Sequence, residues 1–322
     1  MSDTGPRVAV LNPFFKFLPH IEKELLDKYP NTKFWEGPMP ISPEDLVDFC
    51  QDVEIIIPGI FPYFTEEVIS ALPNLKTVSC PSAGLDHIDA EVMKRHGIKV
   101  WWQPGINKES VAELAVSLMI NLIRKVNRTN TILRSGEWPR TGKDGMLIRG
   151  RTVGIHGCGH IGKEVVKYLQ PFGVNIIASD RNDYADFYKE YNVTPVDADT
   201  LWAESDILTI HLSKNKSTIG MYTEDVLAKL KHGIYLVNTA RGGIVDENGL
   251  EARLKDGRIA AAALDVFADE PTERQTLIDL PNFLATPHIG GSAVEAWEAM
   301  SRSAIHGAEK ATVPEPGIYP YD

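Results

Sequence analysis

The sequence has 322 residues, a length that predicts two domains, and its 43% apolar and 24% charged content is typical of a globular protein. Lys and Arg number 33 against 44 Asp and Glu, so the net charge of −11 argues against broad binding of nucleic acid or an anionic membrane. Three cysteines cannot form a disulfide framework, and the absence of a CxxC pair predicts no zinc site. The polar N-terminus and the lack of an 18-residue apolar stretch predict a cytoplasmic protein without secretory signal or membrane span.

Short β-branched runs alternate with helical segments over the first hundred residues. The expected strands are Val8–Leu11, Val53–Ile57, Thr77–Cys80 and Lys99–Trp101. The expected helices are His20–Tyr29, Ser42–Phe49, Thr65–Ala71 and Asp89–His96, with Gly97 as the C-terminal cap of the last. This alternation predicts βαβ units around a parallel sheet.

The longest helical pattern covers Lys108–Arg128 and is apolar on more than one side, which predicts a helix buried between two bodies. Residues 134–150 are rich in Gly and Arg and are expected to form a loop. A second series of strands is expected at Thr152–His156, Asn175–Ser179, Ile207–His211, Tyr235–Asn238 and Ala261–Asp265. After 287–291 a last helix is expected from about Ala293 to Glu309, followed by an irregular, proline-rich tail.

A glycine-rich loop opens the second series of strands. Gly157, Gly159 and Gly162 form G-x-G-x-x-G directly after an expected strand and before an expected helix. Such glycines give a tight turn and close backbone approach to a pyrophosphate, which sits at the helix N-terminus. Asp180 ends the next strand, 18 residues beyond Gly162, where a carboxylate can accept from the adenosine ribose hydroxyls and repel a 2′-phosphate. The pattern therefore predicts a dinucleotide site that favours NAD over NADP, although Arg181 could stack on adenine or contact a phosphate.

Three ionisable residues follow expected strands of the second series. Arg241 lies in VNTARGGIVDE, Glu270 in LDVFADEP and His288 in ATPHIGGS. The carboxyl ends of parallel strands are where open α/β sheets bind ligands. Each residue alone has an ordinary structural explanation, Arg241 as a helix-capping surface residue and Glu270 as a solvated loop acid. Their joint occurrence favours a catalytic group.

These segments resemble the D-isomer-specific 2-hydroxyacid dehydrogenase family. The likeness extends over PSAGLDHIDAEVMKRHGIKV, NKESVAELAVSLMINL, GRTVGIHGCGHIG, LVNTARGGIVDENGL, ALDVFADEP and TPHIGGS, and the ordered set is far more specific than any one piece. In that family an Arg, a Glu and a His act together, and the matching positions are Arg241, Glu270 and His288.

The chemistry of a 2-oxo acid agrees with these roles. A guanidinium can grip the carboxylate in a bidentate manner and polarise the ketone, which Lys would do less well, and this predicts the role of Arg241. His288 is the expected proton donor, because the ordinary pKa of histidine, about 6.5, lies near neutral pH. Glu270 would fix its tautomer through the other ring nitrogen. In the reverse direction neutral His288 would act as the base.

The resemblance also implies the remaining ligand contacts. Main-chain N–H groups of Ala83 and Gly84 would meet the substrate carboxylate, and Asp265 would accept from the nicotinamide carboxamide. Ser213 departs from the family pattern, where a proline is usual. The expected cofactor-binding residues are Gly157, Gly159, His160, Ile161, Gly162, Asp180, Arg181, His211, Ser213, Thr239, Ala240, Asp265, His288 and Gly290. Aromatic residues that could line the side-chain pocket, and would favour an uncharged substituent, are Phe14, Phe15, Tyr63, Phe64 and Trp297.

The expected architecture is α/β, with two Rossmann-like or flavodoxin-like domains of parallel strands. A substrate domain formed by residues 1–101 and 291–322 would contain the inserted NAD-binding domain, residues 102–290, with hinges near Trp102 and Gly291. The resemblance implies a homodimer in which the 108–128 helix and the following loop make the contacts. Two alternatives remain: a formate-dehydrogenase-like enzyme, against which Glu270 argues, and a non-enzymatic NAD-sensing scaffold of the corepressor type.

Overall fold

The computed structural model describes residues 5–59, 62–140 and 145–317. The chain forms two compact units, one made of Met1–Asn107 and Ser292–Asp322, the other of Lys108–Gly291. The second unit is thus a continuous insertion in the first, and both are built on parallel sheets, which confirms the predicted fold class. Within the described ranges, no helix has the length and apolar character that a bilayer crossing requires.

The first unit is a five-stranded parallel sheet in the order β2-β1-β3-β4-β5. Its strands are β1 (Val8–Val10), β2 (Thr32–Phe34), β3 (Ile55–Ile57), β4 (Thr77–Ser79) and β5 (Lys99–Trp101). Its helices are α1 (Pro19–Lys28), α2 (Pro43–Cys50), α3 (Glu66–Ser70), α4 (Ala90–Arg95) and α13 (Val294–Gly307), with 3-10 turns at Pro13–Phe17 and Ala308–Lys310.

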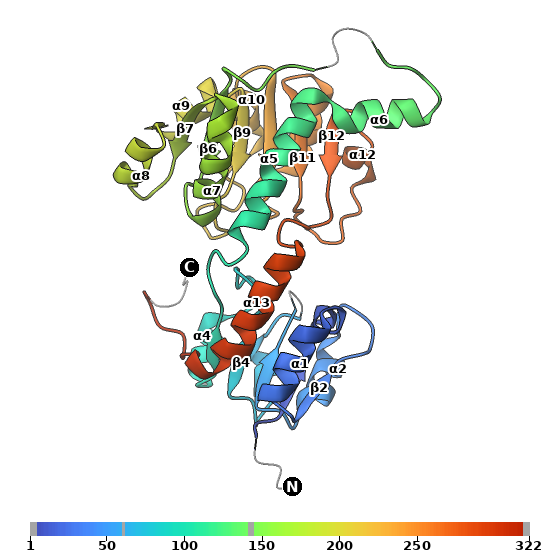
Figure 1. Ribbon diagram of the computed structural model, residues 1–322, viewed down its shortest axis with the longest axis vertical. Coiled ribbons are helices and arrows are strands. Elements are labelled where there is room, and N and C mark those ends of the chain that lie inside the picture. Colours follow the sequence, from blue (N-terminus) through green and yellow to red (C-terminus); the bar gives the residue numbers. More distant parts are fainter. Residues whose placement is uncertain (1–4, 60–61, 141–144, 318–322) are drawn as a thin grey trace. The chain divides into compact units, whose positions relative to one another are not determined.

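Alternate residues of these strands enter two apolar layers, because successive side chains of a strand point to opposite faces. Val8 and Val10 pack with α1 and α13, whereas Ala9 packs with the layer formed by α2, α3 and α4. Figure 1 shows α13, from the C-terminal part of the chain, beside α1. The Ser79 hydroxyl donates to the Ala304 carbonyl at 2.7 Å and fastens α13 to β4.

The second unit is a seven-stranded parallel sheet in the order β12-β11-β10-β9-β6-β7-β8. Its strands are β6 (Thr152–His156), β7 (Asn175–Ser179), β8 (Val193–Pro195), β9 (Ile207–Ile210), β10 (Ile234–Asn238), β11 (Ile259–Leu264) and β12 (Phe283–Ala285). Its helices are α5 (Lys108–Arg124), α6 (Val126–Arg134), α7 (His160–Leu169), α8 (Ala185–Glu190), α9 (Ala198–Glu204), α10 (Glu224–Lys229), α11 (Glu247–Lys255) and α12 (Gln275–Ile278), with a 3-10 turn at Gln170–Phe172.

The strand order reverses between β6 and β9, so the crossovers from these strands leave in opposite directions. Helices α5 and α7 pack together on one face of the sheet, and α9, α10 and α11 contribute to the layer on the other. A sheet covered on both faces binds ligands at the carboxyl ends of its strands, beside the reversal. This edge carries the glycine loop and the three ionisable residues.

The predicted helix over 108–128 is wrong in one respect. The helix α5 ends at Arg124, Lys125 adopts a left-handed backbone with φ 55°, and a separate helix α6 runs on to Arg134. Of the loop predicted for 134–150, residues 141–144 lie outside the described residues. As far as residue 317 the tail is irregular apart from isolated bridges, of which the one between Thr312 and Val100 is antiparallel.

Candidate active site

The glycine loop has the geometry that a bound pyrophosphate needs. Gly157 follows β6 with φ 93°, and a Cβ there would come 2.7 Å from the His211 carbonyl oxygen. At Gly162 a Cβ would lie 2.2 Å from the Gly157 carbonyl oxygen, so the helix α7 packs directly on the loop. Gly159, by contrast, faces open space, and no side chain caps the N-terminus of α7 at His160. Open space in front of uncapped helix N–H groups suits a phosphate.

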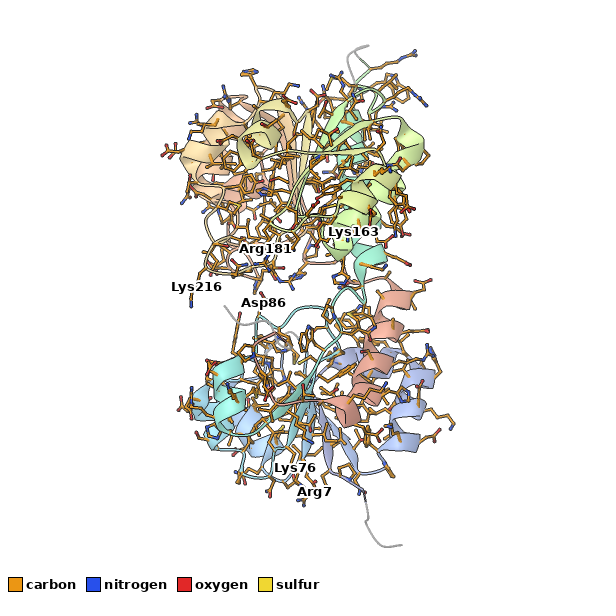
Figure 2. The ribbon with its side chains drawn as sticks, turned by 90° about the vertical axis from the view of Figure 1, so that its left-hand side faces the viewer. Arg7, Lys76, Asp86, Lys163, Arg181 and Lys216 are labelled. Carbon is orange, nitrogen blue, oxygen red and sulfur yellow. The ribbon has the colours of Figure 1, made fainter. Side chains whose placement is uncertain are left out.

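Asp180 joins the glycine loop to the end of β7. One carboxylate oxygen accepts from the Cys158 N–H at 2.7 Å and the other from the Asn182 N–H at 2.8 Å. An ionised carboxylate has about four acceptor positions, so two remain for ribose hydroxyls. The side chains of Lys163 and Arg181 lie at the same edge of this unit (Figure 2). The Lys163 ammonium lies 3.6 Å from the centre of the Tyr184 ring.

Two buried polar atoms near the ends of β9 and β10 have no hydrogen-bond partner among the described residues. They are His211 Nδ1 and Thr239 Oγ1. The other His211 nitrogen pairs with Thr209 Oγ1 at 2.9 Å, and burial lowers the pKa of His211, so the ring is neutral at neutral pH. Buried polar atoms usually have a partner, so these two fit a polar ligand at this edge. The Ser213 carbonyl instead accepts from Thr218 Oγ1 at 2.6 Å.

The three ionisable residues predicted from the sequence lie within one unit, near the ends of β10, β11 and β12. His288 Nδ1 pairs with Glu270 Oε2 at 2.7 Å, and Glu270 Oε1 accepts from the Phe267 N–H at 2.9 Å. The pairing at Nδ1 leaves Nε2 as the nitrogen that can exchange a proton with a ligand. Both side chains are half-buried, with 35% of His288 and 25% of Glu270 exposed.

Glu270 is held in its ionised form. Burial raises its pKa, but the hydrogen bonds from His288 and Phe267 and the charge of Arg241 outweigh this and lower the pKa below its ordinary value. Arg241 directly follows Ala240, and its Nη1 donates to the Ala240 carbonyl at 2.8 Å. The site thus presents one fixed guanidinium and one imidazole oriented by a carboxylate.

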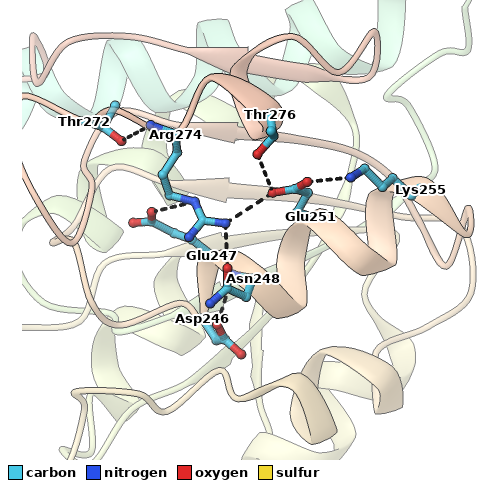
Figure 3. A network of polar contacts seen from close by, with 8 residues as sticks. All are labelled: Asp246, Glu247, Asn248, Glu251, Lys255, Thr272, Arg274 and Thr276. Carbon is cyan, nitrogen blue, oxygen red and sulfur yellow. Dashed lines mark hydrogen bonds and ion pairs between the residues drawn. The ribbon is translucent and has the colours of Figure 1, made fainter.

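The segment that carries Glu270 is anchored at both ends on α11 (Figure 3). The buried Glu247 accepts from the Ala268 N–H at 2.7 Å, and Arg274 places its Nε 3.5 Å from the same carboxylate. Arg274 Nη2 also donates to Asn248 at 2.7 Å and to Glu251 at 3.2 Å. Because Glu270 lies between these two anchors, the network limits the motion of its carboxylate.

Asp265, expected as a carboxamide acceptor, already accepts three hydrogen bonds within the protein. Its carboxylate accepts from Thr286 Oγ1 at 2.6 Å, the Ile289 N–H at 2.9 Å and the Gly290 N–H at 2.8 Å. Burial, which outweighs these donors, raises its pKa. One acceptor position remains for a carboxamide. The first role of Asp265 in the fold is therefore to hold the backbone that follows His288.

The first unit places its predicted carboxylate loop at the carboxyl edge of its own sheet. Figure 2 shows Asp86, at the end of this loop, opposite Arg7 and Lys76, which precede β1 and β4. Within the loop the Ser82 hydroxyl donates to the Gly84 carbonyl at 2.7 Å.

In the described parts of both units, no group of three or more His, Cys, Asp and Glu could hold a metal ion.

The predicted aromatic pocket is partly wrong. Phe15 and Phe64 are fully buried in the core of the first unit and cannot line a pocket. Phe14 is exposed and stacks on Trp297 with 4.3 Å between ring centres, and Tyr63 is also exposed. Sequence reasoning also missed Glu247 and Arg274, which hold the segment that carries Glu270. Their partners are distant in sequence, and no local pattern signals such contacts.

Fold and site together define an NAD-binding dehydrogenase, with the nucleotide unit as a Rossmann domain. The family model for the NAD-binding domain of D-isomer specific 2-hydroxyacid dehydrogenases matches residues 116–290. The chain belongs to this family and is an oxidoreductase acting on CH–OH donors, with NAD as its cofactor.

Relatives and solved structures agree with this assignment. The chain is 39% identical to a hydroxypyruvate reductase of Thermotoga maritima over 79% of its own length and 83% of that protein. It superposes on a glyoxylate reductase of Paecilomyes thermophila with TM-score 0.83 and 30% identity, covering 96% and 98% of the two chains. For the Aquifex aeolicus D-lactate dehydrogenase complexed with NAD and lactic acid, the TM-score is 0.83 with 26% identity, at 94% coverage of both. The chain spans about half the length of the D-3-phosphoglycerate dehydrogenases that it matches.

Proposed function

We propose that this protein reduces a 2-oxo acid to the D-2-hydroxy acid with NADH, and runs the reverse reaction with NAD. The observation that carries the proposal is the 2.7 Å pair between His288 and Glu270, next to Arg241, at the carboxyl edge of the NAD-binding sheet. A carboxylate partner is what an imidazole needs in order to act as both acid and base. The same pair argues against a formate-dehydrogenase-like reaction, which needs no proton donor of this kind.

NADH supplies the hydride when it is bound. Arg241 binds the substrate carboxylate in a bidentate manner and polarises the ketone oxygen, which aligns the carbonyl carbon for attack. His288, protonated at Nε2 and held at Nδ1 by Glu270, then gives its proton to the developing alkoxide. In oxidation, neutral His288 accepts the hydroxyl proton, and ionised Glu270 stabilises the imidazolium that forms.

A small or moderately sized uncharged substituent suits this chain. Two of the proteins that this chain resembles are named for hydroxypyruvate and glyoxylate, and a solved structure holds lactic acid, whereas the chain matches only about half the length of the relatives named for phosphoglycerate. In the first unit Phe14, which follows β1, stacks on Trp297 in the first turn of α13, and 41% of Phe14 stays exposed. An exposed aromatic stack at a ligand-binding sheet edge favours apolar substituents over charged ones.

The test measures NADH oxidation with glyoxylate, hydroxypyruvate, pyruvate, 4-methyl-2-oxopentanoate and phenylpyruvate, followed by chiral analysis of the product. We expect turnover of at least one of them, with a D product, and no NAD reduction by formate. NADH binding without turnover of any 2-oxo acid would support the NAD-sensing scaffold instead. A product of L configuration would also contradict the proposal.

We further propose a homodimer formed through α6 and the residues after it. No residue of α6 is buried, and Figure 1 shows the helix standing away from the sheet of its own unit. Trp138 and Leu147 are 79% and 71% exposed, which is unusual for apolar side chains close together in sequence. Trp138→Glu should yield a monomer in light scattering, whereas Phe17→Glu, at another exposed aromatic residue, should not.

A cytoplasmic location is proposed from the thiols. Cys50, Cys80 and Cys158 are all buried and unpaired. Burial raises the pKa of Cys158 to about 11 and of Cys50 to about 12, so both stay as unreactive thiols. Unpaired cysteines are typical of a reducing compartment. A fluorescent fusion localised in the source cell would test this.

A further inference from the structure

His288 has an unusual backbone. Its φ is 54°, and among the described residues other than glycine only Lys125 and Asn192 share a positive φ. The left-handed region disfavours side chains with a Cβ, and a residue stays there only when its surroundings hold it. Contacts that fix the backbone at this position therefore decide where the imidazole of His288 points.

Asp265 holds the segment on one side. Besides the three hydrogen bonds to its carboxylate, its carbonyl accepts from the His288 N–H at 2.8 Å. The N–H groups of His288, Ile289 and Gly290 thus all point to one residue at the end of β11. These bonds fix the N–H groups of the segment but not the Gly290 carbonyl, which is bound by another element.

Ser110, in the first turn of α5, holds the other side. Its hydroxyl donates to the Gly290 carbonyl at 2.6 Å, across 180 residues of sequence. A Cβ at Gly290 would lie 3.0 Å from Asp265 Oδ2 and 3.5 Å from the Val111 methyl groups. Gly290 therefore lies between Asp265 and α5: its N–H donates to Asp265 and its carbonyl accepts from Ser110.

The hydrogen bond between Ser110 and Gly290 also connects two distant parts of the chain. Ser110 lies just after the first passage of the chain between the two units, at Asn107–Lys108, and Gly290 lies just before the second, at Gly291–Ser292. The hydrogen bond therefore joins residues near the two ends of the second unit's chain.

We propose that Ser110 is a positioning residue for the catalytic histidine. Its hydroxyl fixes the Gly290 peptide, so that His288 keeps its left-handed backbone and its Nδ1 stays on Glu270. In this role Ser110 acts through His288. The inference rests on the proposed reduction of a 2-oxo acid, because its effect is read in turnover.

The first experiment compares Ser110→Ala with the unaltered protein, using NADH and the fastest 2-oxo acid of the panel. Loss of one part-buried hydrogen bond that acts on the catalytic geometry should lower kcat by roughly tenfold. We expect KM and the NADH Kd, measured by fluorescence, to change less than about twofold. Ser110→Thr, which keeps the hydroxyl, should recover kcat to within about threefold of the unaltered protein.

Ser117→Ala is the matched control on the same helix. The Ser117 hydroxyl is exposed and donates to the Leu114 carbonyl of its own helix at 2.9 Å. This substitution should leave kcat unchanged. If Ser110→Ala does not fold, Ser110→Cys, with its weaker donor, takes its place and should lose most of the turnover that Ser110→Thr keeps.

A double-mutant cycle separates positioning from a general structural role. If Ser110 acts through the pair of His288 and Glu270, Ser110→Ala should cost less than about twofold in kcat once Glu270→Gln is present. An inactive unaltered protein would contradict the proposed function itself. An active protein in which Ser110→Ala keeps full kcat, or loses the same factor with and without Glu270→Gln, would overturn the role of Ser110 alone.

Discussion

Two histidines at the same edge of one sheet have opposite chemistry. His288 is half-buried, pairs with the carboxylate of Glu270 and stands on a left-handed backbone. His211, directly after β9, pairs with the hydroxyl of Thr209, and burial lowers its pKa. A carboxylate stabilises the imidazolium, whereas a hydroxyl in a buried setting leaves the ring neutral. The partner and the burial, rather than the residue type or the strand end, decide which histidine can exchange protons.

The largest effect is expected at His288 itself. His288→Asn should lower kcat by a factor of about 10² to 10⁴, because it removes the proton donor. The NADH Kd should change far less, because the substitution leaves unaltered the glycine loop and Asp180, which we expect to bind the other end of the cofactor. Steady-state kinetics measures kcat, and fluorescence titration measures the NADH Kd. Equal losses in both would mean that His288 is structural, and the contrast with His211 would disappear.

Glu270→Gln sharpens the comparison by giving His288 a neutral partner, as His211 already has. Glutamine can still accept from Nδ1 but cannot stabilise the imidazolium, so kcat should fall by roughly 10- to 100-fold. The lowered pKa of Glu270 implies a contribution to stability that is present above its ordinary value of about 4.5 and is lost as pH falls through the lowered value. On acidification the free energy of unfolding, measured in urea, should therefore decrease less in Glu270→Gln than in the unaltered protein.

A smaller effect is expected at the nucleotide end of the same edge. Asp180→Ala removes the acceptor and the negative charge that disfavour a 2′-phosphate, so the preference for NADH over NADPH should narrow by roughly tenfold. The ratio of kcat/KM values for the two cofactors measures this. Asp183→Ala, at an exposed carboxylate three residues on, is the control. An unchanged ratio in Asp180→Ala would remove Asp180 from the ribose site.

The smallest effect concerns His156, a second buried histidine with a neutral partner. Its Nδ1 pairs with the Tyr222 hydroxyl at 2.5 Å, and burial lowers its pKa to about 4. The unfolded chain binds a proton near pH 6.5 and the folded chain does not, so stability is full above that pH and falls as pH decreases toward 4. Between pH 7 and 5 the free energy of unfolding, measured in urea, should fall by about 2 kcal/mol more in the unaltered protein than in His156→Asn. Equal losses would show that His156 is protonated in the fold.

The elements that the sequence predicted correctly are those with a strong local signal. The strand, glycine loop and helix from Thr152 onward need only short apolar runs and glycines at fixed spacing. The glycine that ends α4, Gly97 with φ 67°, is a local signal in the same way. The short edge strands β2 and β8 escaped notice because three residues at a sheet edge have little apolar periodicity.

The sequence alone determined the class of fold, the NAD cofactor and the family, because these depend on local patterns that keep their order along the chain. Only the tertiary structure decided which groups meet. The pairing of Glu270 with His288 joins residues 18 positions apart, and the hydrogen bond from Ser110 to Gly290 joins residues 180 positions apart. The left-handed backbone of His288 is likewise set by contacts with its surroundings. Such contacts depend on the packing of whole strands and helices, which no short window of sequence contains.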